Sequence, residues 1–123
     1  MRLLGVSLMY KIIPSFEKYE INVYGEVRNR TTKHILKPQK HSQGYLILRL
    51  SDSHNYTENV YIHRLMGITF MDNPNNYSDI NHIDGNKENN KLDNLEWCSR
   101  QENIKHAWRT GLSKHHTWLV KTK

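Results

Sequence analysis

Apolar and polar residues alternate along two stretches in the first half of the chain, and this period of two constrains the fold more than any other feature. The first stretch, residues 19–30, is divided by a Tyr24-Gly25 turn, and the second, residues 45–50, carries three leucines on one face. Because successive side chains of a strand point to opposite faces of a sheet, both stretches predict half-buried strands. After a turn at residues 53–55, the run 59–62 is placed to pair back on the second stretch. We therefore expect a small antiparallel sheet in this half.

The hydrophobic pattern changes in the second half, where it predicts two helices and two short strands. Apolar residues within 63–71 have helical spacing. Ser99 and Glu102 form a capping box, in which each side chain satisfies a free backbone N–H at a helix start, and the helix should run to about Thr110. Between the two helices, short strands are expected at 79–83 and 94–98, joined by a polar loop. The predicted fold class is therefore α+β.

Length and cysteine content limit the classes of protein to which the chain can belong. Its 123 residues suit one compact domain, or a core with a small appendage. Cys98 is the single cysteine, which excludes an intramolecular disulfide and a zinc site with two or more thiolates, and suits a reducing cytoplasm. No apolar stretch reaches the ~18 residues of a membrane span, and Met1–Tyr10 is interpreted as a strand or docked arm rather than a signal peptide.

The charge balance points to a polyanionic partner. The chain has 18 Lys and Arg residues against 12 Asp and Glu, which gives a net charge of +6 and a pI near 9.5. Its basic residues are scattered rather than gathered in one block, which is typical of a folded surface.

Polar side chains concentrate at matching places of the predicted strands and final helix. His82 lies on the first strand beside Asn81, Asn94 opens the second strand, and Asn103 lies one turn into the helix. If the helix packs across the strand pair, we expect these four side chains to converge on one point.

The same segment resembles a known family. The run NHIDGNKENNKLDNLEWCSRQENIKHA, residues 81–107, closely resembles the HNH nucleases of phage and intron homing endonucleases. EINVYGEVRN at 20–29, GYLILRL at 44–50 and IHRL at 62–65 resemble the module that precedes the nuclease in that family. The resemblance implies an N-terminal antiparallel sheet that binds DNA (residues 1–60), a ββα-metal nuclease core (61–112) and a basic C-terminal tail (113–123).

The resemblance also implies roles for the four polar residues. His82 would be the general base, since imidazole is neutral near physiological pH, and Asn94 would orient its loop or ring. Asn81 and Asn103 would offer amide oxygens to Mg²⁺, with Mn²⁺ as a substitute and no structural zinc. Asn81 departs from the commoner Asp or His, so we expect weak metal binding in the absence of DNA. Asp84 is a rival ligand, although Asp before Gly also forms turns.

The implied activity is hydrolysis of double-stranded DNA. One active site cuts one strand, so double-strand cleavage would require a homodimer or two successive events. A phage or mobile element acting in the cytoplasm of a bacterial host is the implied source. The alternatives are a DNA-binding protein that retains the fold without turnover, and a nuclease of RNA. Candidate DNA contacts lie on the predicted sheet, in the IHRL segment and on the final helix: Arg28, Arg30, Lys33, Lys37, Lys40, Arg49, Arg64, Arg100, Lys105 and His106.

Overall fold

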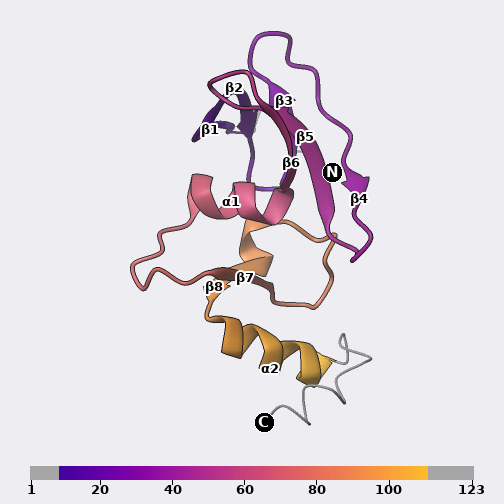
Figure 1. The fold of residues 1–123 in the computed structure, drawn as a ribbon, viewed down its shortest axis with the longest axis vertical. Coiled ribbons are helices and arrows are strands. Elements are labelled where there is room, and N and C mark those ends of the chain that lie inside the picture. Colours follow the sequence, from indigo (N-terminus) through magenta and orange to yellow (C-terminus); the bar gives the residue numbers. More distant parts are fainter. Residues whose placement is uncertain (1–8, 111–123) are drawn as a thin grey trace.

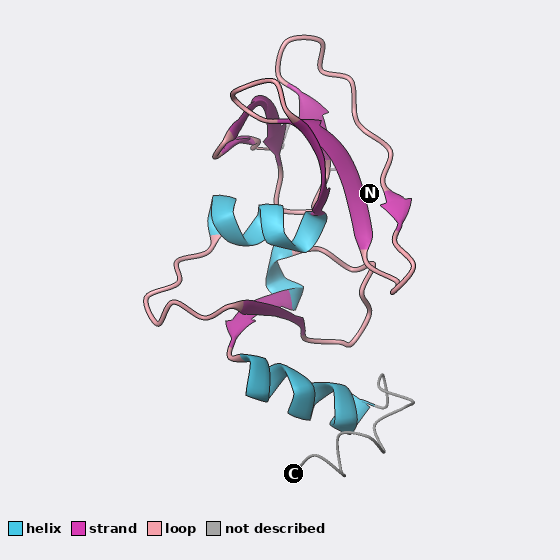
Figure 2. Cartoon of the chain, in the orientation of Figure 1, coloured by secondary structure: helices cyan, strands magenta, loops and turns pink. Residues whose placement is uncertain are grey.

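The computed structural model describes residues 9–110, which form an α+β fold (Figures 1 and 2). The predicted basic tail and most of the predicted arm at Met1–Tyr10 lie outside this range. The first half contains two three-stranded antiparallel sheets, built from β1 (Lys11–Ile13), β2 (Phe16–Ile21), β3 (Val27–Asn29), β4 (Gln39–Lys40), β5 (Leu46–Ser51) and β6 (Thr57–Tyr61). The second half contains α1 (Ile62–Phe70), β7 (Asp79–His82), a turn of 3₁₀ helix η1 (Leu92–Asn94), β8 (Leu95–Cys98) and α2 (Arg100–Thr110).

The hairpin predicted around Gly25 is confirmed, and the side chain of Asn22 holds its turn. The Asn22 Oδ1 atom accepts hydrogen bonds from the backbone N–H groups of Tyr24 (2.9 Å) and Glu26 (3.0 Å). Gly25 has φ +84°, a conformation that a residue without Cβ adopts at low cost. The strands β2 and β3 pair on either side of this turn, from Ile21 opposite Val27 outward.

The second predicted strand pair is also confirmed, but it belongs to a sheet of its own. β5 and β6 pair antiparallel, with Ile47 opposite Tyr61 and Ser51 opposite Thr57. The expected single sheet is thus two sheets, each with an additional strand, β1 and β4, that the alternating pattern does not predict. β4 is only two residues long, and both of them are exposed, so it is too short to have a detectable period.

The hydrophobic core is continuous from the two sheets through α1 to the β7–β8 pair. Leu50 of β5, Leu65 and Met66 of α1, and Ile80 of β7 belong to one buried cluster. α1 therefore lies between the sheets and the β7–β8 hairpin, as Figure 2 shows. No helix of the described residues is long and apolar enough to cross a membrane.

The β7–β8 hairpin has a helix on each face, α1 on one and α2 on the other (Figure 1). Gly67 of α1 allows a close approach, because a Cβ built there would lie 2.5 Å from Ile80 Cδ1 and 2.8 Å from the Trp97 ring. On the opposite face α2 begins at the predicted capping box. The Ser99 N–H donates to Glu102 Oε1 (3.1 Å), and the Glu102 N–H donates to Ser99 Oγ (3.1 Å).

Candidate active site

The alternation of β7 divides the candidate residues between the two faces of the hairpin. Ile80 and His82 face α1, because Ile80 packs against Gly67 and the His82 ring lies 5.1 Å from the ring of His63. Asp79 and Asn81 face α2. Strand alternation therefore directs the side chains of Asn81 and His82 to opposite faces of the hairpin, and the convergence of His82, Asn94, Asn81 and Asn103 on one point stays a prediction.

Asn81 and Asn103 do share a face, between β7 and α2. The Asn81 Nδ2 atom donates to Glu96 Oε1 (3.0 Å), and the Asn103 Nδ2 atom donates to Asp79 Oδ2 (3.1 Å). No hydrogen bond among residues 9–110 reaches either amide oxygen. The two carboxylates thus fix both amides through their nitrogens and leave both oxygens as acceptors.

This pair fits a hard divalent cation through its donor chemistry. Amide oxygens suit Mg²⁺ and Mn²⁺, and the neighbouring carboxylates of Asp79 and Glu96 add the negative charge that neutral Asn81 lacks. Arg100 Nη1 lies 4.0 Å from Asp79 Oδ2 and offsets part of that charge. Among the described residues no three His, Cys, Asp or Glu side chains gather to hold a metal, so a cation here would depend on amide oxygens.

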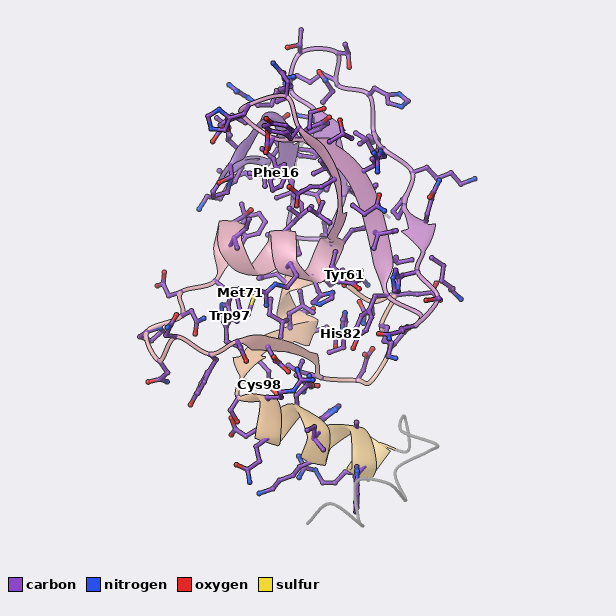
Figure 3. The ribbon with its side chains drawn as sticks, viewed as in Figure 1. Phe16, Tyr61, Met71, His82, Trp97 and Cys98 are labelled. Carbon is purple, nitrogen blue, oxygen red and sulfur yellow. The ribbon has the colours of Figure 1, made fainter. Side chains whose placement is uncertain are left out.

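His82 is buried on the other face of the hairpin, where rings surround it (Figure 3). Its Nε2 atom lies 2.8 Å from Asn90 Oδ1, and the ring of Tyr45 lies 5.9 Å away. Burial lowers the pKa of His82 below its usual value, and the Asn90 hydrogen bond opposes that shift in part. Burial, reinforced by His82, lowers the pKa of His63 to about 3. Both imidazoles are therefore neutral at physiological pH.

Asn94 closes the loop that follows His82. Its Oδ1 atom accepts from the Asp84 N–H (3.0 Å), and its Nδ2 atom donates to Asp84 Oδ1 (2.9 Å) and to the Asn89 carbonyl (2.9 Å). Asp84 also accepts from Asn89 and Asn86, and these bonds lower the pKa of its carboxyl group. The turn interpretation of Asp84 thus matches its contacts, and Asn94 holds the loop rather than the ring of His82.

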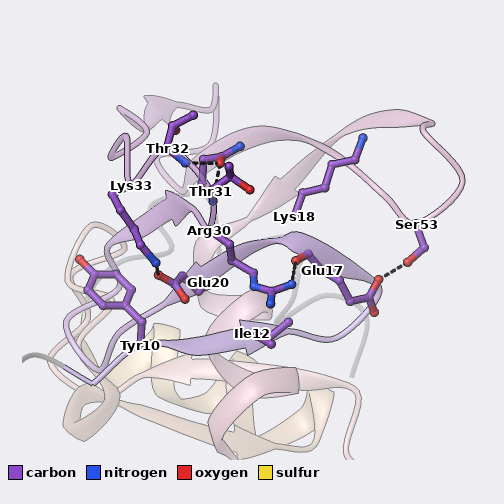
Figure 4. Close-up of a pocket in the computed structure, with 11 residues that line it drawn as sticks. Tyr10, Ile12, Glu17, Lys18, Glu20, Arg30, Thr31, Thr32, Lys33 and Ser53 are labelled. Carbon is purple, nitrogen blue, oxygen red and sulfur yellow. Dashed lines mark hydrogen bonds and ion pairs between the residues drawn. The ribbon is translucent and has the colours of Figure 1, made fainter.

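Most of the predicted DNA contacts already have partners within the protein. Arg28 and Lys33 pair with Glu20, Lys40 pairs with Glu88, and Arg100 with Asp79. Arg49 bonds the side chain of Asn59, while Arg30, Arg64 and His106 bond the carbonyls of Glu17, Ser78 and Ile83. Lys37 and Lys105 are exposed. Arg30 and Lys33 line an open hollow of about 1000 Å³ on the first sheet (Figure 4).

Three residues that sequence reasoning did not place in the site contact its predicted members. Asn90 bonds His82, Glu96 bonds Asn81, and Asp79 bonds Asn103. Strand periodicity could have found Asp79, which lies two residues before Asn81 and so shares its face. Asn90 carries no comparable signal, because an Asn in a polar loop is most simply interpreted as a turn former.

An antiparallel hairpin crossed by a helix, with Asn and His on the hairpin and Asn on the helix, is the ββα arrangement of HNH nucleases. The HNH endonuclease family model matches residues 60–105, and the NUMOD4 motif matches residues 10–51. The second half of the chain therefore carries an HNH endonuclease domain and the first half a NUMOD4 motif, and HNH nucleases typically use a divalent metal. The predicted resemblance and the α+β fold class are confirmed.

Individual relatives come from viruses and phages. An uncharacterized HNH endonuclease of Acanthamoeba polyphaga mimivirus is 41% identical over 92 residues, covering 75% of this chain and 28% of the relative. The H-N-H endonuclease F-TflII of Escherichia phage T5 is 31% identical over 110 residues, covering 88% and 55%. The structure titled "DNA binding and cleavage by the HNH homing endonuclease I-HmuI" has a TM-score of 0.74 at 26% identity, over 93% of this chain and 67% of that one. The chain spans between 26% and 59% of the length of its curated relatives.

Proposed function

We propose that this chain is a metal-dependent endonuclease unit of the homing type, which hydrolyses phosphodiester bonds in double-stranded DNA. The observation that carries the proposal is the pair formed by Asn81 and Asn103. Their amide nitrogens are held by Glu96 and Asp79, which leaves two hard oxygen atoms beside two carboxylates on one face of the hairpin. The I-HmuI structure, whose title names DNA binding and cleavage, supports the choice of DNA as substrate.

Asn81 and Asn103 would hold Mg²⁺, or Mn²⁺ in its place. When bound, the cation supplies positive charge to the scissile phosphate and to the leaving oxygen. Glu96 and Asp79 orient the two amides, and together with Arg100 they set the local charge. Because the protein offers only two neutral ligands, we expect metal affinity weaker than micromolar without DNA. Calorimetry on the free protein tests this, and tighter binding would contradict the ligand assignment.

His82 would act as the general base. Its Nε2–H donates to Asn90, so Nδ1 is the nitrogen that can accept a proton from water. Its lowered pKa keeps it unprotonated, as a base must be. The side chain is only 5% exposed, so the proposal requires DNA binding to open access to it. Hydrogen–deuterium exchange should report that opening as loss of protection in residues 82–94 on addition of DNA.

A second candidate function is a DNA-binding protein that keeps the HNH fold without turnover. Two observations favour it: His82 is buried on the face opposite Asn81, and Asn81 carries no charge of its own. Its basic surface would still bind the DNA backbone, through residues such as Lys37 and Lys105, which are exposed.

A plasmid nicking assay separates the two functions. We expect the wild type to relax supercoiled plasmid in the presence of Mg²⁺ or Mn²⁺, and His82→Ala to do so about 10²–10⁴ times more slowly. His54→Ala is the matched control, because His54 lies exposed on the β5–β6 turn. If the wild type leaves every plasmid of a broad sequence panel intact with both metals, but retards it on a gel, the binding function replaces the nuclease function.

The same assay addresses assembly. One site cuts one strand, so a monomer should produce open circles, and linear plasmid in a single encounter would require a homodimer. Sedimentation of the protein with and without DNA identifies which form is present.

A further inference from the structure

Asn90 is a buried polar residue whose side chain points at His82. It lies in the loop between β7 and β8, is 5% exposed, and places Oδ1 2.8 Å from His82 Nε2. An amide oxygen can only accept a hydrogen bond, so His82 must carry its proton on Nε2. Asn90 therefore selects one tautomer of a neutral imidazole and fixes the plane of the ring.

The β2–β3 turn of the N-terminal sheet packs directly on Asn90. A Cβ built on Gly25 would lie 3.2 Å from Asn90 Cβ and 3.2 Å from the Asn90 carbonyl oxygen. Two residues after Asn90, the Leu92 N–H donates to the Val23 carbonyl of the same turn (2.8 Å). This turn thus holds the backbone on which Asn90 is carried.

The second sheet holds the same loop on the other side of Asn90, at Lys87. Lys87 donates to the Gln43 carbonyl (2.8 Å), and its ammonium group lies 4.8 Å from the ring centroid of Tyr45. Tyr45 in turn faces the ring of His82. The loop that carries Asn90 is therefore attached to the NUMOD4 half of the chain on both sides of Asn90, at Lys87 and at Leu92.

We propose that Asn90 is a positioning residue for His82, and that the Gly25 turn of the N-terminal half holds Asn90 in register. The proposal rests on the proposed function for the role of His82 in cleavage. The N-terminal half then contributes to the nuclease site in addition to any contact it makes with DNA. It holds in place the loop whose residue Asn90 orients His82.

The first experiment changes Asn90 and reads the His82 tautomer by long-range ¹H–¹⁵N NMR of the full chain near pH 7. We expect the Nε2–H tautomer in the wild type and in Asn90→Asp, which keeps an acceptor at the same place. Asn90→Leu removes the acceptor, so both tautomers should appear. Its kcat for plasmid nicking should fall about a hundredfold, while KM and DNA affinity stay unchanged. As a control for folding, the NMR spectrum of each variant should show the same chemical-shift dispersion as that of the wild type.

The second experiment compares two glycines in equivalent conformations. Gly25 has φ +84° and Gly44 has φ +96°, so alanine carries a similar backbone penalty at both. The Cβ at residue 25 meets Asn90, whereas the Cβ at residue 44 meets only the Lys87 side chain, at 3.3 Å. Gly25→Ala should therefore shift the His82 resonances and lower kcat, and Gly44→Ala, whose new Cβ meets only the flexible Lys87 side chain, should have a much smaller effect on both.

The outcomes that overturn the proposal are distinct from those that overturn the nuclease function. An Nδ1–H tautomer in the wild type, or an unchanged tautomer in Asn90→Leu, removes the role of Asn90. Equal effects of Gly25→Ala and Gly44→Ala remove the role of the turn. If the wild type does not cleave DNA but the NMR results are as expected, the positioning stands and the proposed function fails.

Discussion

Asn94→Ala should loosen the loop between β7 and β8 without disrupting the hydrophobic core. Asn94 is 7% exposed and makes its hydrogen bonds to Asp84, at the start of that loop, and to Asn89, near its middle. Alanine removes all of them and leaves the Asp84 N–H and the Asn89 carbonyl without a partner. Because this loop carries Asn90, the substitution also acts on the residue that holds His82.

The magnitude follows from the three hydrogen bonds of the Asn94 side chain. A hydrogen bond of this kind contributes about 1 kcal/mol net to stability, so their loss should cost about 3 kcal/mol. Asn86→Ala is the control, because the Asn86 Oδ1 atom accepts a single bond, from the Glu88 N–H, on the exposed side of the same loop. We expect it to cost about 1 kcal/mol.

Amide hydrogen exchange measures this change where it occurs. Since 1.4 kcal/mol corresponds to a factor of ten, about 3 kcal/mol should accelerate exchange of the Asp84 amide on the order of a hundredfold. Exchange in β5 and α1 should change far less. Protection at Asp84 equal to that of the wild type would refute the reasoning, as would an Asn86→Ala effect of the same size.

Three further predictions test the burial, packing and charge of the site. The pKa of His63 is lowered to about 3 in the folded protein, so below about pH 6.5 the unfolded chain binds a proton that the folded protein does not. The free energy of unfolding should therefore fall as the pH drops from 6.5 toward 3, by up to about 1.4 kcal/mol per pH unit. Urea unfolding at pH 7 and pH 5 should show this, and an equal dependence in His63→Phe would contradict it. Gly67→Ala should destabilise the protein by about 1–2 kcal/mol, because overpacking against Ile80 and Trp97 outweighs the gain in helix propensity. Thermal melts should show this loss, and adding Ile80→Val to the variant should restore part of it. Asn81→Asp should tighten Mn²⁺ binding in calorimetry, because it puts a carboxylate where an amide oxygen stands, and unchanged affinity would exclude Asn81 as a ligand.

Local signals predict the elements of the fold well because their causes lie within a few residues. The leucines of β5 alternate because one face of that strand packs on the core, and Leu48 and Leu50 are buried there. The capping box at Ser99 and Glu102 forms as expected because it involves one helix turn. The division into two sheets depends on long-range pairing, for which strands as short as β4 leave no trace in the sequence.

The site was predicted less completely, for two different physical reasons. Asn81 and His82 are neighbours on a strand, so strand alternation directs their side chains to opposite faces, a constraint that the expected convergence left out of account. Asn90 could not have been found in this way, since its role depends on contacts with a turn 65 positions earlier in the chain, at Gly25.

The attachment of the β7–β8 loop to both N-terminal sheets has a consequence for recombination between family members. A chimera joined near residue 60 would bring together a turn and a loop that were selected in different chains. The Gly25 turn of one parent chain must then match Asn90 of the other, and the Gln43 carbonyl of the first must match Lys87 of the second. Exchange of the N-terminal half to alter DNA preference is therefore expected to reduce cleavage unless residues 84–94 are exchanged with it.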